Sequence, residues 1–217
     1  DDPYVSGGPA SAVAYDTLAR DGRRFVSLRT PAEQIQAVCG PSAEPVRVYI
    51  GLYTAPTVEQ RVDLALAELE RLGGLERKTL LVMSPAGSGY AEYVAAESVE
   101  CFTGGDCASV VVQYGVLPSV LSLRRVELGA LTVRTLLDRL AERLREMPKP
   151  PRVLMYGRAS AHGSHRKPCR SAPVWSARKA AWTAWMHWCP WEPRVAGRCV
   201  TRCCGHRVSS TWTAGSS

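Results

Sequence analysis

The chain has 217 residues, of which 46% are hydrophobic and 22% charged, and its formal net charge is +7. This length predicts one domain or slightly more. No stretch approaches the roughly 20 consecutive apolar residues of a membrane-spanning helix, and no collagen, coiled-coil or other repeat is present, which excludes those classes. The chain begins with Asp1 and lacks a charged-then-apolar signal segment, so we expect a processed or excised piece of a longer protein.

The composition changes abruptly after Gly157. Residues 1–157 hold 17 Lys and Arg against 19 Asp and Glu, a net charge of −2, whereas residues 158–217 hold 10 against the single acid Glu192, a net charge of +9. All six Trp, all four His and five of the eight Cys follow Gly157, and this segment lacks Leu, Ile, Phe, Tyr, Asp and Gln. Such a composition is improbable for a segment that packs a core. We therefore predict an irregular or disordered basic tail over 158–217.

The first part begins without clear periodicity. Residues 1–45 are rich in Gly, Pro, Ser and Ala, with turn signals at 7–9 and 40–41, and are expected to form an irregular lead-in with one short helix. Residues 46–52 alternate with period two, which is typical of a strand with one covered face. Thr57 and Gln60 then have the spacing of a capping box, and apolar residues recur at helical spacing until Gly73.

The same unit repeats along the rest of this part. Continuous apolar runs predict strands at 79–84 and 109–114, and a further strand is expected at 152–157. Helices are expected at 91–102 and at about 130–147. This alternation predicts an α/β domain over 46–157, with a parallel sheet and right-handed crossover helices.

Chemistry in such sheets gathers where strands end at their carboxyl edge. The predicted second strand runs into Pro-Ala-Gly-Ser-Gly at 85–89, in which Gly87, Ser88 and Gly89 are candidates for an oxyanion loop. A purely structural turn remains an alternative, and so does a nucleotide loop, although the spacing and the Lys of a P-loop are absent. The other informative strand end is Tyr156-Gly157.

The order of elements resembles the α/β-hydrolase core, in which a strand, a glycine-containing oxyanion loop and two further strands lead to a G-x-S-x-G nucleophile elbow. The sequence is also similar to the catalytic domain of a membrane-anchored α/β-hydrolase family that has a multi-span N-terminal domain. The segments that carry this similarity are 22–26, 45–52, 84–90, 105–108, 113–119 and 152–157. The resemblance covers about residues 4–157.

This resemblance implies a partial α/β-hydrolase-like sheet and, in the intact protein, a serine esterase or lipase-like enzyme. Its substrate would be a small-molecule or lipid ester, it would need no cofactor, and a missing N-terminal domain would attach it to a membrane. No specific nucleic-acid partner is expected, and the oligomeric state is left open.

The nucleophile elbow departs from the family pattern. The family has Gly-Glu-Ser-Leu-Gly, whereas residues 157–163 read Gly-Arg-Ala-Ser-Ala-His-Gly. Ala159 therefore stands at the nucleophile position, Ser160 is a weak candidate one residue late, and Tyr156-Gly157 is a remnant of the elbow. The acid and the histidine of a triad follow the serine in this fold, and none of the four His of the tail can be assigned that role. We therefore predict that this chain is inactive as a hydrolase.

A reading-frame shift is our hypothesis for the tail. One restored base after the first two of the Gly157 codon converts 157–163 into Gly-Glu-Ser-Leu-Gly-Ala-Trp, if suitable codons are used. The same frame converts 199–206 into Val-Arg-Asp-Ala-Leu-Leu-Arg-Ala, a composition typical of a surface helix. The two recovered stretches share one reading frame, and the composition changes at the position of the missing base.

Other interpretations of the cysteines and the tail remain open. The cysteines at 189, 199, 203 and 204 with His206 fit no zinc-site spacing, so no metal site is expected. Cys39, Cys101 and Cys107 are interpreted as ordinary thiols, with a disulfide as the alternative. The alternative functions are a non-catalytic ligand-binding module at the Gly87 loop and a nucleic-acid or membrane-surface binder that uses the basic tail.

Overall fold

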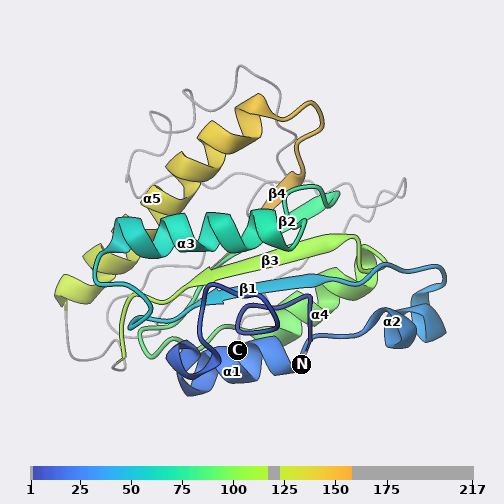
Figure 1. The fold of residues 1–217 in the computed structure, drawn as a ribbon, viewed down its shortest axis with the longest axis horizontal. Coiled ribbons are helices and arrows are strands. Elements are labelled where there is room, and N and C mark those ends of the chain that lie inside the picture. Colours follow the sequence, from blue (N-terminus) through green and yellow to red (C-terminus); the bar gives the residue numbers. More distant parts are fainter. Residues whose placement is uncertain (1, 117–122, 158–217) are drawn as a thin grey trace, which may run out of the picture. The chain divides into compact units, whose positions relative to one another are not determined.

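The computed structural model describes residues 2–116 and 123–157. Four strands form one parallel sheet in the order β1-β3-β2-β4, with bounds β1 Val46–Ile50, β2 Thr79–Ser84, β3 Cys107–Val112 and β4 Arg152–Gly157. The crossover helices are α3 Val58–Arg71, α4 Tyr93–Phe102 and α5 Leu123–Glu146. Figure 1 shows α3 and α5 on one face of the sheet, and α4 on the other face together with α1, Ala19–Ser27. The predicted α/β class with a parallel sheet and crossover helices is confirmed.

Helix α3 begins and ends as its sequence predicts. The Thr57 hydroxyl accepts a hydrogen bond from the Gln60 N–H at 3.2 Å, and the Gln60 side chain accepts one from the Thr57 N–H at 3.4 Å, which completes a capping box. The apolar stripe of this helix faces the sheet and is buried at Val58, Val62, Ala65, Leu66 and Leu69. Gly73, with a φ of +65°, turns the chain out of the helix.

Strand β1 differs from its prediction because both of its faces are covered. All five of its residues are buried, including Arg47 and Tyr49 on the face that alternation assigned to solvent. Helix α1 approaches Tyr49 closely, since a Cβ on Gly22 would lie 2.4 Å from the ring. The period-two pattern therefore reflects a buried polar side chain, not an exposed face.

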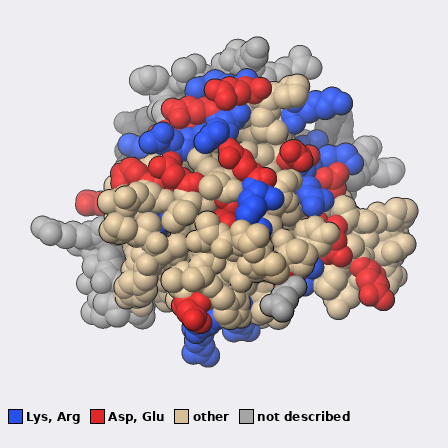
Figure 2. All heavy atoms as spheres, viewed as in Figure 1, with Lys and Arg blue, Asp and Glu red and all other residues tan. Residues whose placement is uncertain are grey.

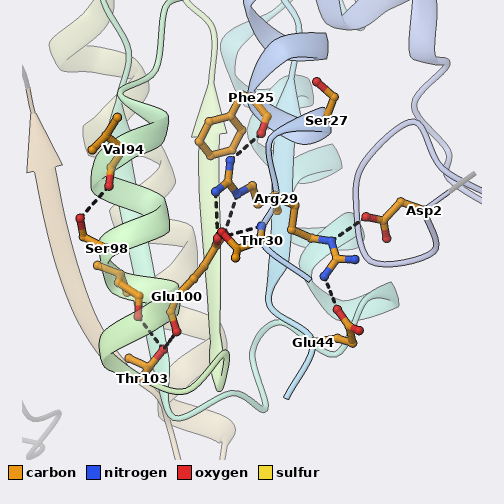
Figure 3. A network of polar contacts seen from close by, with 12 residues as sticks. Asp2, Phe25, Ser27, Arg29, Thr30, Glu44, Val94, Ser98, Glu100 and Thr103 are labelled. Carbon is orange, nitrogen blue, oxygen red and sulfur yellow. Dashed lines mark hydrogen bonds and ion pairs between the residues drawn. The ribbon is translucent and has the colours of Figure 1, made fainter. Parts of the chain in front are cut away.

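A buried ion pair satisfies Arg47 (Figure 3). Its guanidinium donates to both carboxylate oxygens of Glu100 at 2.6 and 2.9 Å, and to the Phe25 carbonyl at 2.7 Å. Both side chains of the pair are fully buried. Glu100 also accepts from the Thr30 N–H at 3.2 Å. The pair thereby ties α4 to β1 and to the segment that follows α1.

The lead-in is more ordered than the sequence predicted. It contains a 3₁₀ turn at Tyr15–Leu18, helix α1 and helix α2 at Ala32–Cys39, where one short helix was expected. Helix α1 carries mostly polar residues, and its contribution to the core comes from Phe25 and Val26, which is too few apolar positions for a clear periodicity.

The interpretation of Cys39 and Cys101 as ordinary thiols is wrong in this structure. The two residues form a disulfide with a Cα–Cα distance of 6.4 Å, and this bond joins the last residue of α2 to α4. Their separation of 62 residues hides the pairing from sequence reasoning, because only the fold brings α2 beside α4. Cys107 is a free, buried thiol.

Two further sequence predictions concern the tail and membrane-spanning helices. The tail 158–217, with Ala159 and Ser160, lies outside the described residues. Within the described ranges, no helix combines the length and the apolar character needed to cross a bilayer.

Candidate functional site

The carboxyl ends of β2 and β4 lie side by side at one edge of the sheet. Their parallel register runs from Thr79 opposite Arg152 to Ser84 opposite Gly157, and a Cβ on Gly157 would lie 3.8 Å from the Ser84 Cβ. From β2 the chain crosses to β3 on one side, while β4 pairs with β2 on the other side. This reversal of strand order is a topological switch point, the place where open α/β sheets bind ligands.

The glycine loop that follows β2 is folded back on itself. The Ala86 N–H donates to the Tyr90 carbonyl at 2.8 Å, and the Gly89 N–H donates to the Ala86 carbonyl at 2.8 Å. Among the residues that the structure describes, the N–H groups of Gly87 and Ser88 have no hydrogen-bond acceptor. Two of the three predicted oxyanion-loop residues thus have a free N–H within the described part of the chain, whereas the Gly89 N–H is used inside the loop.

Gln113, the residue after β3, holds the glycine loop in place through hydrogen bonds of its side chain. Its side-chain amide donates to the Ser88 carbonyl at 3.2 Å and to the Gly115 carbonyl at 2.8 Å, and its oxygen accepts from the Leu52 N–H at 3.1 Å. The residue is 1% exposed. This one side chain therefore connects the ends of three segments, those after β1, β2 and β3.

Tyr49 of β1 gives the loop its second support. Its hydroxyl donates to the Gly89 carbonyl at 2.8 Å. Burial raises the pKa of this phenol, with a smaller contribution from the charge of Asp21, so the hydroxyl remains a neutral donor. Gly89 has a φ of +95°, and a Cβ there would lie 2.5 Å from the Gln113 amide nitrogen and 2.8 Å from the Tyr49 hydroxyl oxygen. Only glycine fits this position.

Sequence reasoning missed both supporting residues. Gln113 follows the buried run Val110–Val112 directly, and an uncharged polar residue at the end of a buried strand is a usable signal of a site at the sheet edge. Tyr49 gave no signal, because its place in an alternating strand predicted contact with solvent.

The catalytic side of the predicted site is described only up to Gly157. Tyr156 is half-buried and Gly157 is exposed at the end of β4, the strand that precedes the predicted elbow. Ala159, Ser160 and all four His lie outside the described residues. In the described part of the chain, no group of three or more His, Cys, Asp or Glu side chains is placed to hold a metal ion. The described half of the site offers backbone N–H donors for a developing negative charge.

The charges on the face drawn in Figure 2 have mixed signs. Lys and Arg side chains are interspersed with Asp and Glu, most densely over the region where Figure 1 places α3 and α5. A nucleic-acid interface requires a continuous basic patch or stripe. The described residues of this face do not provide one.

A parallel sheet with a glycine loop at its switch point defines an α/β protein whose ligand site lies at the carboxyl edge. The sequence matches the model of the alpha/beta-hydrolase family over residues 46–179, and the chain belongs to this family. The match begins at β1 and continues past Gly157, so its limits differ at both ends from the resemblance over 4–157. No curated protein and no solved structure matches the chain.

Proposed function

We propose that the intact protein is a serine hydrolase that cleaves the acyl esters of small molecules or lipids. The observation that supports this proposal most directly is the register of β2 and β4, which places the glycine loop after Ser84 beside the strand that leads to the predicted nucleophile elbow. The free N–H groups of Gly87 and Ser88 support an oxyanion-binding role for this loop. Attachment to a membrane through a further N-terminal domain is part of the same proposal and rests on the resemblance of sequence.

The proposed chemistry is acyl transfer through a covalent intermediate. The elbow serine attacks the ester carbonyl while a histidine takes its proton, and the histidine returns this proton to the leaving alcohol. Water then hydrolyses the acyl-enzyme by the same route. The carbonyl oxygen becomes negative in both steps, and backbone N–H donors stabilise it by about 3 kcal/mol each. In this role the Gly87 loop lowers the barrier without any titrating side chain.

We further propose that the chain as given lacks this activity. Ala159 occupies the nucleophile position, and Ser160 follows one residue late, where its side chain would point elsewhere. Loss of a single coding base accounts for both the altered elbow and the changed composition of 158–217. The direct test is to resequence the coding DNA across Tyr156 and Gly157, and to compare the chain as given with the chain that carries the restored base.

Both chains should be treated with a fluorophosphonate probe and assayed on p-nitrophenyl acyl esters. We expect a burst of product and covalent labelling only in the restored chain, and loss of both when its elbow serine is replaced by alanine. Labelling of Ser160 in the chain as given would overturn the proposed inactivity. A restored chain that folds but neither reacts nor hydrolyses would overturn the hydrolase proposal. Thermal stabilisation by phosphates alone would favour a binding module instead.

A further inference from the structure

A groove lies at the end of β1, on the same sheet edge as the glycine loop. Its volume is about 540 Å³, and it is formed by the loop after β1, the first turns of α3 and one residue of α5. Most of its lining is apolar, and its residues include Leu52, Tyr53, Pro56, Val58, Leu128 and Arg61. Among the described residues of this lining, Arg61 is the only charged one.

Arg61 differs from Arg47, the other buried arginine of the described residues, and from the half-buried Arg29. Arg47 pairs with Glu100, and Arg29 pairs with Asp2 and Glu44. Arg61 is only 4% exposed and forms no ion pair with any described residue, and its Nε has no hydrogen-bond partner there. A buried guanidinium without an anion is unfavourable.

The hydrogen bonds of Arg61 satisfy only part of its guanidinium. Its Nη1 donates to the Ala55 carbonyl at 2.8 Å and to the Pro56 carbonyl at 3.3 Å, which holds the loop against α3. Burial lowers the pKa of Arg61, and the charge of the exposed Glu59 opposes this effect only through space. The side chain thus has a structural role, and it also carries a positive charge that no described carboxylate neutralises.

The start of α3 adds to the positive potential of the groove. In the described ranges, the N–H groups of Val58 and Glu59 have no acceptor, as is usual for the first turn of a helix. The positive end of the helix dipole therefore lies at the same wall as Arg61. Charge and apolar lining together match a ligand with an oxyanion and an aliphatic part.

Gln113 connects this groove to the glycine loop. Its side-chain oxygen accepts from Leu52, which lines the groove, and its amide donates to the Ser88 carbonyl. A ligand in the groove therefore lies on the same edge as the proposed oxyanion donors.

We propose that the groove between the β1–α3 loop and Leu128 binds the anionic group of an amphiphilic ligand, with Arg61 as its counter-ion. The ligand class is an aliphatic molecule that carries a carboxylate or a phosphate. Identification of this ligand as the ester substrate rests on the proposed hydrolase function, whereas binding itself does not. In that case the enzyme acts on acyl esters that bear a negative charge.

The test is a titration of the full chain followed through the side-chain Nε–H resonance of Arg61. The probes are octanoate, octyl phosphate, inorganic phosphate and, as a neutral match, octanol. We expect saturable shifts with octanoate or octyl phosphate, and binding of octanol and of inorganic phosphate that is weaker by at least about tenfold. Comparison of the first two probes distinguishes a carboxylate ligand from a phosphate ligand.

Variants separate binding from folding. Arg61→Met should weaken binding of the anionic probes by at least about tenfold, while Arg139→Met, at an exposed position of α5, should leave it unchanged. Because Arg61→Met also removes hydrogen bonds to the loop, Leu128→Trp is the second variant. It fills the groove from α5 without altering Arg61, and it should abolish the shifts.

Two results would overturn the proposal. One is the absence of any saturable shift with both octyl anions, and the other is undiminished binding in a folded Arg61→Met variant. Neither depends on turnover, so failure of the hydrolase proposal is recognised separately by the fluorophosphonate experiment. If binding is confirmed and labelling of the restored chain fails, the groove is a ligand site of a non-catalytic domain.

Discussion

Ser84 and Gly157 are register partners at the last positions of β2 and β4. This pairing brings two strand ends together that are separated by a helix, a strand and a second helix along the chain. Because β4 joins the sheet beside β2 and not beside β3, the glycine loop and the end of β4, the strand that precedes the predicted elbow, share one edge. The candidate site is therefore a consequence of strand order, and its precision depends on how firmly the loop is held.

The first prediction concerns Gly89, which lies against both side chains that support the loop. Gly89→Ala places a methyl group 2.5 Å from the Gln113 amide nitrogen and 2.8 Å from the Tyr49 hydroxyl oxygen, at a φ of +95°. We expect a loss of about 2–4 kcal/mol in the free energy of unfolding, since strain of the backbone and steric overlap act together. Urea unfolding and hydrogen exchange of the loop amides measure the effect.

Gly40→Ala is the matched control for this prediction. Gly40 has a similar φ of +85°, but a Cβ there meets no atom within 4 Å. It should therefore show only the cost of the left-handed conformation, about 1 kcal/mol. Equal losses in the two variants would contradict the role that we assign to Gln113 and Tyr49 in fixing the loop.

The second prediction concerns the buried ion pair between Arg47 and Glu100. Glu100→Gln leaves the fully buried guanidinium of Arg47 without its counter-ion, and we expect a loss of about 3–5 kcal/mol in the free energy of unfolding. Arg47→Met should cost a similar amount, because it leaves a buried carboxylate. Urea unfolding of each variant measures these losses.

The double variant Arg47→Met with Glu100→Met tests the reason for these losses. Apolar side chains of similar volume remove both charges at once, so this variant should be much more stable than either single variant. Additive losses, with no recovery in the double variant, would show that the two side chains act independently and that desolvation of an unpaired charge is not the cause.

The positions of the strands and of most crossover helices could be predicted because each carries its own periodic pattern. The capping box at Thr57 and the apolar run at 79–84 are local signals that tertiary contacts reinforce. The predicted exposure of one face of β1 failed at Arg47, since the burial of this residue depends on Glu100, which lies 53 residues away. Long-range pairing of polar groups leaves little trace in local periodicity.

The candidate site was predictable to a similar degree. Gly87 and Ser88 follow an apolar strand in a form that indicates a loop with open N–H groups, and the structure leaves these two N–H groups without a described acceptor. The use of the Gly89 N–H inside the loop, and the support from Gln113, depend on contacts between separate strands. Sequence alone therefore placed the loop but not the groups that fix its geometry.

The third prediction concerns the disulfide between Cys39 and Cys101. It closes a loop across a sequence separation of 62 residues, so Cys39→Ser should lower the free energy of unfolding by about 2–4 kcal/mol under oxidising conditions. Reduction should destabilise the original chain by the same amount and leave the variant unaffected. Peptide mapping under non-reducing conditions must show the Cys39–Cys101 linkage, and linkage of either residue to another cysteine would contradict the structure.

The fourth prediction is a pH dependence that arises from Glu68. This carboxylate accepts hydrogen bonds from the Ser11 hydroxyl at 2.8 Å, the Ala12 N–H at 3.1 Å and the Arg71 guanidinium at 2.8 and 3.0 Å. Burial alone would raise its pKa, but hydrogen bonds from Arg71, Ser11 and Ala12 hold the pKa below the ordinary value of 4.5. The ionised form is thus favoured in the folded state.

A lowered pKa in the folded state means that Glu68 stabilises the fold fully above its unfolded pKa, and that this stability is lost as the pH falls through the lower folded value. Glu68→Gln should therefore cost about 1–3 kcal/mol near neutral pH, and this difference should shrink once the pH falls below 4.5. Urea unfolding over a series of pH values measures the difference, with Glu142→Gln on the exposed side of α5 as the control. At low pH Glu68 is protonated, and a protonated carboxyl should then be equivalent to the amide of glutamine. A difference that stays constant with pH would therefore show that the Glu68 contacts do not depend on its charge.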